Sequence, residues 1–275
     1  MNPLECLENV QRHFADIGAS LILGPFARRN RQNDYALDVR TDARGRERFV
    51  VSWDGHCHLE LQVLHKEKGR RHLLLLVKKE SSDGEEKHRY LCGHDERHWF
   101  AATVPNGARG AVSTVAKAME ALKPPEVQLS QQRARLRTKV WQRRHNPGFL
   151  RQGEWFFVPA PEFEIDPRLV LHDEPLTRGG KPHRAEWLVR TGGRTVYVSR
   201  QHPQGLSQAR YQEIRRTQPE ARFWDWRVMR ADPTVHCRGT IRHPDHATLV
   251  LPFWHQVHPN TEAKAPWREK LVFLD

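Results

Sequence analysis

The feature that most constrains the fold is a series of short apolar segments separated by polar turns. Residues 58–64 alternate apolar and polar side chains, which is typical of a half-buried strand. Lys68-Gly69 separates this segment from the aliphatic run Leu73–Val77, so the two segments predict a hairpin. The same pattern predicts two further hairpins, within residues 35–53 and 88–104. The amino-terminal part of the chain is therefore expected to be rich in β-structure.

Helical spacing of apolar residues is confined to a few short stretches. These are residues 4–14, 111–122 and 206–216, and Pro124-Pro125 ends the second of them because proline cannot continue a helix. The remaining carboxy-terminal segments predict strands, including a hairpin of 187–190 with 195–199 across Gly192-Gly193 and a pairing of 235–241 with 248–253.

These patterns predict an α+β protein with two β-rich halves and a few short helices, joined by a basic helical segment. We expect an α+β domain over 1–123, a basic linker or arm over 124–150 and a mostly β domain over 151–275. At 275 residues, with 38% hydrophobic side chains, the chain has enough apolar material for substantial cores.

The amino terminus has no apolar run of signal-peptide length, and no segment approaches the roughly 20 apolar residues of a membrane span. The four cysteines are far apart and form no CxxC pair, which favours reduced thiols over a disulfide framework. The sequence therefore predicts a cytoplasmic protein with no membrane partner.

The excess positive charge is concentrated in one short segment. The formal net charge is +12, yet residues 1–127 carry 20 basic against 18 acidic side chains, and residues 152–275 carry 18 against 15. The segment 128–151 carries seven basic side chains and no acidic one. A purely solvating helix usually mixes both signs, so this composition favours a polyanionic partner.

A single helix over residues 129–144 would place Arg133, Arg137, Trp141 and Arg144 on one stripe, with Arg135 and Lys139 in a neighbouring row. Guanidinium groups suit phosphate oxygens, and an indole among them offers a surface on which a base can stack. The sequence thus predicts a nucleic-acid-binding site formed by Arg133, Arg135, Arg137, Lys139, Trp141, Arg143, Arg144 and Arg151.

The seventeen histidines form several short clusters with cysteine or carboxylate neighbours. No cluster has the spacing of a known structural zinc motif, so the sequence predicts no cofactor. Zinc remains an open alternative, with two groups as its better seats: Cys92, His94 and His98, or His243, His246 and His255.

His246-Ala-Thr248-Leu resembles one His-x-Thr-x motif of the 2H phosphoesterases, in which an imidazole acts as general acid or base on a phosphodiester. That family has two such motifs, and this sequence contains no second His-x-Ser/Thr, so no family is assigned. Proton transfer by His246 with Asp245 or His255 is a separate alternative. The candidate catalytic residues are therefore His246, His243 and His255.

We expect a nucleic-acid-binding protein that contacts the phosphate backbone, whether of DNA or RNA. The first alternative is a histidine-dependent nuclease or phosphoesterase. The second is an assembly subunit that binds an acidic protein surface, for example among the other protein subunits of a nucleoprotein complex. The sequence has no GxxxxGK[ST] loop, no GxGxxG and no GxSxG elbow, which argues against ATP-driven function and serine hydrolase chemistry.

Overall fold

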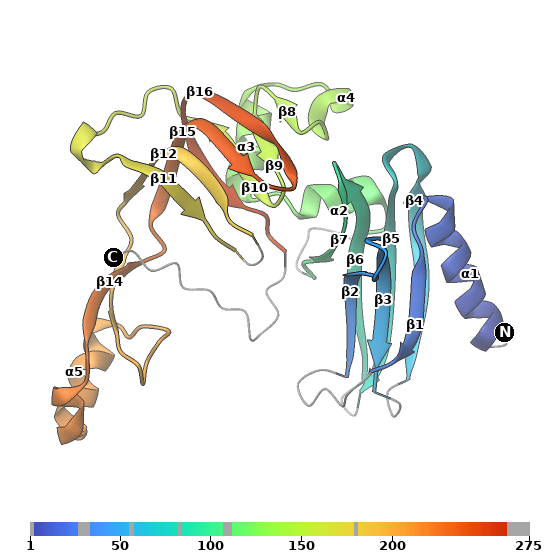
Figure 1. Ribbon diagram of the computed structural model, residues 1–275, viewed down its shortest axis with the longest axis horizontal. Helices are drawn as coiled ribbons and strands as arrows, with labels where there is room; N and C mark the ends of the chain where they lie inside the picture. Colours follow the sequence, from blue (N-terminus) through green and yellow to red (C-terminus); the bar gives the residue numbers. More distant parts are fainter. Residues whose placement is uncertain are drawn as a thin grey trace. The chain divides into compact units, whose positions relative to one another are not determined.

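The structure is a computed structural model that describes residues 3–26, 34–54, 58–81, 84–106, 112–178 and 181–262. Strands make up 50% and helices 21%, which confirms the α+β class in its broad form. The chain divides into two compact units (Figure 1). One runs to Asn146 and includes Pro259 with the residues just after it, and the other spans Pro147–His258. None of the described helices is long and apolar enough to cross a membrane.

The first unit contains two sheets that follow an amino-terminal helix, α1 (Pro3–Asp16). The three-stranded sheet has the order β1 (Leu21–Pro25), β3 (Glu47–Trp53), β2 (Tyr35–Thr41), with β1 parallel and β2 antiparallel to β3. The second sheet is antiparallel and follows chain order: β4 (Leu59–Glu67), β5 (His72–Ser81), β6 (Gly84–Asp95) and β7 (His98–Val104), with the 3-10 turn η1 (Lys68–Arg70) between β4 and β5. The three predicted hairpins, β2–β3, β4–β5 and β6–β7, are confirmed.

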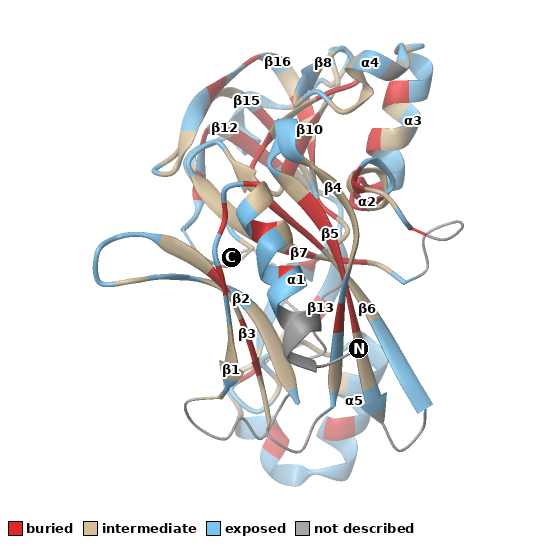
Figure 2. Ribbon diagram, turned by 90° about the vertical axis from the view of Figure 1, so that its right-hand side faces the viewer, coloured by how far each residue is buried: buried red, intermediate tan, exposed pale blue. Residues whose placement is uncertain are grey.

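Strand β5 shows why the sequence contains a continuous aliphatic run. Successive side chains of a strand point to opposite faces, and here both faces are covered. Leu73 and Leu75 lie in a core with residues of α1 and the three-stranded sheet, such as Phe14 and Phe49. Leu74 lies in a second core on the other face, with Val115 and other residues of α2. Buried residues accordingly run along β5 in Figure 2.

Three short helices and a two-residue strand complete the first unit: α2 (Val115–Ala121), α3 (Pro125–Arg133), α4 (Thr138–Trp141) and β8 (His145–Asn146). Thr114 caps α2 by accepting a hydrogen bond from the Lys117 amide at 3.2 Å. Pro125 occupies the first turn of α3, where an amide N–H would have no helical partner. The double proline therefore both ends α2 and starts α3.

The second unit is built around one sheet, in which the strands of Pro147–His258 have the order β11, β12, β15, β16, β10, β9. Their bounds are β9 (Phe149–Gln152), β10 (Trp155–Pro159), β11 (Leu171–Leu176), β12 (His183–Thr191), β15 (Thr234–His243) and β16 (His246–Pro259), with the 3-10 turn η2 (Pro167–Leu169) before β11. Its core includes Phe157, Leu188 and Ile241. The predicted pairing of 235–241 with 248–253 is confirmed as β15–β16.

The predicted hairpin across Gly192-Gly193 is wrong. β12 pairs with β11 and β15, whereas β13 (Arg194–Val198) pairs with β14 (Arg227–Ala231) in a separate two-stranded sheet. Both glycines have positive φ, and a Cβ on Gly193 would lie 2.7 Å from the Ala231 carbonyl oxygen. The chain thus leaves the sheet of β12 at the two glycines and continues into β13, which pairs with β14. The expected helix near residues 206–216 is present as α5 (Gln208–Thr217), followed by η3 (Pro219–Phe223).

Candidate functional site

The charged segment forms two helices instead of the single helix that the sequence predicted. Ala134 and Arg135 close α3 with amide hydrogen bonds to the carbonyls of Ser130 and Gln132, each 3.0 Å long. Arg135 has a φ of +48°, so the chain leaves the helical path at this residue. α4 then starts after Arg137. The expected continuous stripe of side chains is therefore not formed.

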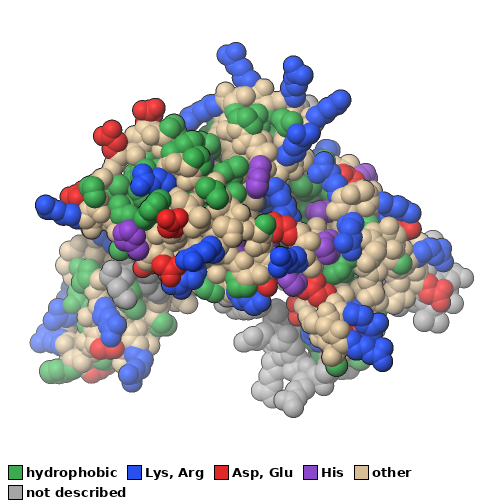
Figure 3. Space-filling model, turned by 45° about the horizontal axis from the view of Figure 1, so that its top comes forward, with side chains coloured by type: hydrophobic (Ala, Val, Ile, Leu, Met, Phe, Trp, Pro, Cys, Tyr) green, Lys and Arg blue, Asp and Glu red, His purple; other side chains and the backbone are tan. Residues whose placement is uncertain are grey.

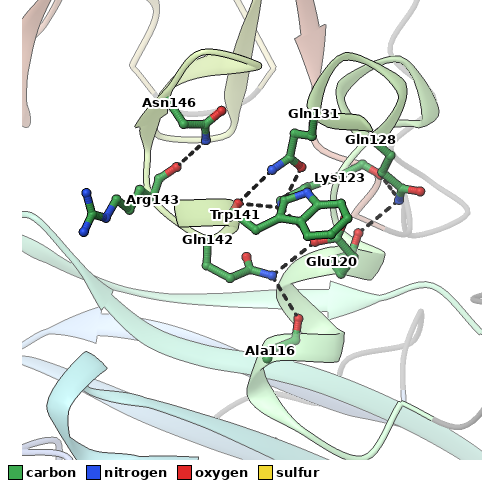
Figure 4. A network of polar contacts seen from close by, with 9 residues as sticks. All are labelled: Ala116, Glu120, Lys123, Gln128, Gln131, Trp141, Gln142, Arg143 and Asn146. Atoms are coloured by element: carbon green, nitrogen blue, oxygen red, sulfur yellow. Dashed lines mark hydrogen bonds and ion pairs between the residues drawn. The ribbon is translucent and has the colours of Figure 1, made fainter. Parts of the chain in front are cut away.

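A buried lysine links the two helices. The Lys123 side chain is 3% exposed and donates to the Glu120 carboxylate at 2.8 Å, to Gln131 Oε1 at 2.9 Å and to the Trp141 carbonyl at 3.0 Å. Gln131 Nε2 also donates to the Trp141 carbonyl, at 2.9 Å (Figure 4). An ammonium has three N–H donors, and each has an acceptor here. This network fixes the position of α4 against α3.

Five basic side chains of the segment are exposed, and we call them the basic surface: Arg133, Arg135, Arg137, Lys139 and Arg143. None of the five is ion-paired with another residue that the structure describes. Each cation therefore keeps its charge available to solvent and to ligands. Lys and Arg side chains project from much of the face drawn in Figure 3, which is turned to bring the top of the molecule forward.

The other three predicted nucleic-acid-binding residues lie in different environments. Arg144 is ion-paired with Asp95 and Glu96. Arg151 is on β9 in the second unit, where its Nε donates to the Gly153 carbonyl at 2.8 Å. Trp141 is half-buried, and its Nε1 is enclosed without a hydrogen-bond partner among the described residues. The structure thus groups only five of the eight predicted residues as exposed, unpaired cations.

A second basic region was not recognised from the sequence. Residues 194–231, which form β13, α5, η3 and β14, contain eight arginines and only three acidic residues. Aromatic rings lie among them: Tyr197 stacks on Tyr211 at 4.0 Å, and Trp224 contacts Trp226 at 5.6 Å. Counting charge over the whole carboxy-terminal half obscured this excess. A window of about 40 residues would have revealed it.

Two of the three candidate catalytic histidines lie together, and a third, unpredicted histidine joins them. His243 ends β15, His246 begins β16, and His183 begins the neighbouring β12. Each offers a ring nitrogen, and the three nitrogens lie within 4.8 Å of one another. We call this group the histidine cluster. His183 was missed because it is 60 residues away in sequence and becomes a neighbour only through the β12–β15 pairing.

His255 lies elsewhere on the sheet. It pairs with Cys237, six residues along β15 from His243, which corresponds to about 20 Å of strand. Its ring is buried, stacks on Phe253 and has Nδ1 2.8 Å from the Phe253 carbonyl oxygen. His255 therefore does not belong to the histidine cluster.

The β9–β10 turn covers the histidine cluster. Gln152 pairs with Trp155, which leaves Gly153-Glu154 as a two-residue turn. The buried Gln152 side chain donates to the carbonyls of Ile241, at 3.3 Å, and Ala247, at 2.5 Å, on either side of the β15–β16 turn. Gly153 has a φ of +57°, and a Cβ there would lie 2.9 Å from His246 Nε2 and 3.2 Å from His183 Nε2. The glycine thus leaves space at the cluster that a side chain would fill.

His183 is the most enclosed member of the cluster, with 1% of its surface exposed. Neither of its ring nitrogens has a hydrogen-bond partner among the described residues. Burial, together with the neighbouring His243 and His246, lowers the pKa of His183 to about 3. The imidazole is therefore neutral near pH 7, which is the form that can coordinate a metal ion.

The other candidate zinc site, Cys92 with His94 and His98, does not form a comparable group. Cys92 is buried in the apolar core of the first unit. His98 has Nδ1 2.6 Å from Glu47, and His94 packs edge-on against Trp99 at 4.9 Å. Within the described ranges, the histidine cluster is the one place where three metal-ligating side chains converge. His56 and Cys57, from another cluster in the sequence, lie outside the described residues.

Comparison with known proteins gives no relative for this arrangement: no family model, no curated protein and no solved structure matches the chain.

Proposed function

We propose that the protein binds nucleic acid by contacting phosphates with the basic surface. The observation that carries this proposal is the set of five exposed cations without acidic partners among the described residues. They lie on α3, on α4 and in the segments between and after these helices, and the buried Lys123 links the two helices. In sequence, this surface lies between the two β-rich halves. Phosphate contacts by Arg and Lys dominate sequence-independent binding to nucleic acids, so this surface suits backbone recognition.

Cations elsewhere in the first unit differ from those of the basic surface in their ion pairing. Many of the unit's other described cations have carboxylate partners, for example Arg46 with Asp42 at 3.0 Å, Lys78 with Glu60 at 2.8 Å and Lys87 with Glu85 at 2.6 Å. Such pairs reduce the charge that a distant anion experiences. The five cations of the basic surface have no such partners among the residues that the structure describes, so an approaching polyanion meets their charges without this compensation.

Trp141 has a structural role that does not depend on contact with a base. Its carbonyl accepts from Lys123 and Gln131, so the residue is part of the buried network beneath the basic surface. The residue is half-buried, and base stacking on its indole stays a prediction. The proposed binding therefore depends mainly on phosphate contacts and not on base stacking.

The test compares two variants with the same change in net charge. One carries Arg133→Gln, Arg137→Gln and Lys139→Gln, and the control carries Arg46→Gln, Lys78→Gln and Lys87→Gln. Each lost phosphate contact is worth about 5- to 10-fold in affinity near 0.1 M salt. We expect the first variant to bind a fluorescent oligonucleotide about 100-fold more weakly or worse, and the control to lose less than about 5-fold.

Equal losses in the two variants would mean that overall charge, and not this surface, governs binding. Failure of the parent protein to bind any oligonucleotide would reject the proposal and leave an acidic protein surface as the partner. Cleavage of labelled RNA or DNA by the parent would instead favour the nuclease alternative.

A further inference from the structure

The histidine cluster contains an interior polar group without an internal partner. A buried donor or acceptor without a hydrogen bond destabilises a protein, and native interiors contain few of them. Both nitrogens of the buried His183 are in this position with respect to the described residues. His243 and His246, by contrast, are only half-buried, so the group can be reached from solvent.

We propose that His183, His243 and His246 form a binding site for a divalent transition-metal ion, with zinc as the best fit. Zinc binds imidazole nitrogen at about 2.0–2.1 Å, and three protein ligands leave a fourth position for water or another ligand. This inference does not depend on nucleic-acid binding.

The hydrogen bonds of His243 favour coordination through Nδ1. The Asp245 amide donates to Nδ1 at 3.1 Å, so this nitrogen carries the lone pair and Nε2 carries the proton. Nε2 lies 3.2 Å from the Lys181 carbonyl oxygen, to which it donates. Metal-ligating histidines commonly donate their second N–H to a carbonyl, which fixes the tautomer. A metal at Nδ1 takes over the lone pair from the Asp245 amide and keeps the bond to Lys181.

The other two ligands face a common space. His183 Nε2 and His246 Nε2 are both close to the position of a Cβ on Gly153, at 3.2 Å and 2.9 Å. Gly153 has no side chain, and its left-handed backbone disfavours one. The β9–β10 turn thus covers the histidine cluster and leaves space between the imidazoles.

The three nitrogens need a modest adjustment to bind the ion. They lie within 4.8 Å of one another, whereas tetrahedral zinc at 2.0–2.1 Å would hold them about 3.3 Å apart. The imidazoles of His183 and His243 are stacked, with centroids 4.2 Å apart. Rotation of the side chains must therefore close the gaps by at most about 1.5 Å. The ligand set contains only nitrogen, which suits zinc and other late first-row ions better than magnesium or calcium.

The test uses the full-length protein, stripped of metal with a chelator that is then removed. Zinc is titrated against a chromophoric chelator, and Co²⁺ absorption reports the coordination geometry. We expect one zinc per chain and the absorption of four-coordinate Co²⁺. His243→Gln and His246→Gln should each lower zinc affinity by at least about 100-fold, because a ligand contributes more than the 10–100-fold typical of an outer-shell partner.

His255→Gln is the matched control, since it removes another histidine of β16 and should leave zinc affinity unchanged. Gly153→Ala should weaken zinc binding by placing a methyl group against two ligands. Gly192→Ala should not, because it has a similar backbone (φ +67°) but open space around it. Circular dichroism checks that each variant is folded.

Zinc binding that is equally strong in the parent and in the His243→Gln/His246→Gln double variant would overturn the proposal, as would binding lost equally in His255→Gln.

Discussion

The basic surface and the histidine cluster both contain polar groups without internal partners, but in opposite environments. The five cations of the basic surface are exposed, so water solvates them and their lack of partners costs little. The ring nitrogens of His183 are buried, where the same lack costs free energy. An unpaired surface charge is a common feature whose meaning depends on how many such charges gather. An unpaired buried nitrogen points to a ligand where further ligating groups converge on it, as His243 and His246 do at His183.

The two sites also differ in what supports them. The basic surface rests on a buried network of side chains around Lys123, formed by residues within about 20 positions of one another. The histidine cluster depends on strand register, because residues from β12, β15 and the β9–β10 turn meet there. Local sequence can therefore point to the first site, whereas only the folded sheet assembles the second.

Replacing Lys123 should produce the largest change in stability. Lys123→Met removes the buried ammonium and its hydrogen bonds to the Glu120 carboxylate, Gln131 Oε1 and the Trp141 carbonyl. The Trp141 carbonyl keeps the bond from Gln131 Nε2, whereas Gln131 Oε1 loses the donor shown in Figure 4. The Glu120 side chain is 35% exposed, so water can solvate its carboxylate in the variant, and the main loss is that of the hydrogen bonds of the ammonium. Hydrogen bonds to a charged group contribute about 1.5–3 kcal/mol each, and we expect a loss of about 3–4 kcal/mol in urea unfolding. Nucleic-acid affinity should fall as well, although no cation of the basic surface has been changed.

Lys117→Met is the matched control, since Lys117 is an exposed lysine on the neighbouring helix α2. It should change stability by less than about 0.5 kcal/mol. A similarly small effect for Lys123→Met would show that the network does not support the basic surface.

A second prediction concerns the free-energy cost of a buried imidazole away from the histidine cluster. His236 on β15 is 7% exposed, stacks on Phe163 at 3.7 Å, and its Nδ1 lacks a hydrogen-bond partner among the described residues. Burial, followed by the nearby His258, lowers the pKa of His236 to about 4. Its unfolded pKa is about 6.5, so the unfolded state binds the proton more tightly.

The contribution of His236 to stability is therefore complete above pH 6.5 and is lost as the pH falls from about 6.5 to about 4, by about 3 kcal/mol. His236→Leu should lose correspondingly less stability over this range in urea unfolding. His172→Leu, which removes an exposed histidine, should behave like the parent. Identical acid sensitivity of His236→Leu and the parent would contradict the assignment.

The smallest expected effect is that of Arg135→Gly, which should change protein stability and oligonucleotide affinity in opposite directions. Arg135 has a φ of +48°, a conformation that glycine adopts without strain. Arg135→Gly should stabilise the protein by about 0.5–1 kcal/mol in urea unfolding, yet weaken oligonucleotide binding by about 5- to 10-fold. Arg137→Gly removes the same charge at a φ of −70°, so it should weaken binding without the gain in stability. A stabilised variant with unchanged affinity would exclude Arg135 from the binding surface.

Much of the first unit could be predicted from sequence because its β-hairpins are local. Alternating segments joined by short polar turns define β2–β3, β4–β5 and β6–β7, and each partner lies close in the chain. The same reasoning failed at Gly192-Gly193, because the strands on either side, β12 and β13, belong to different sheets. Their pairing depends on the approach of Gly193 to Ala231, a contact across the fold that no local pattern reveals.

The candidate sites show the same limit. Charge counting located the basic surface, but it could not show that Arg144 is ion-paired or that Arg151 lies on a strand of the other unit. The adjacency of His243 and His246 followed from their spacing in a hairpin. His183 could not be added without knowing that β12 pairs with β15. Sequence therefore identified the types of side chain, and strand pairing determined which of them meet.

The most direct test of the proposed function is the salt dependence of oligonucleotide binding. Counterion release gives a slope of log affinity against log salt of about −0.9 per phosphate contact for duplex DNA, and about −0.7 for single strands. We expect the parent to give a slope of about −3 to −5 for a duplex. The Arg133→Gln/Arg137→Gln/Lys139→Gln variant should be flatter by about 2 to 3 units, because three contacts are lost. An unchanged slope in that variant would show that the basic surface does not contact phosphates.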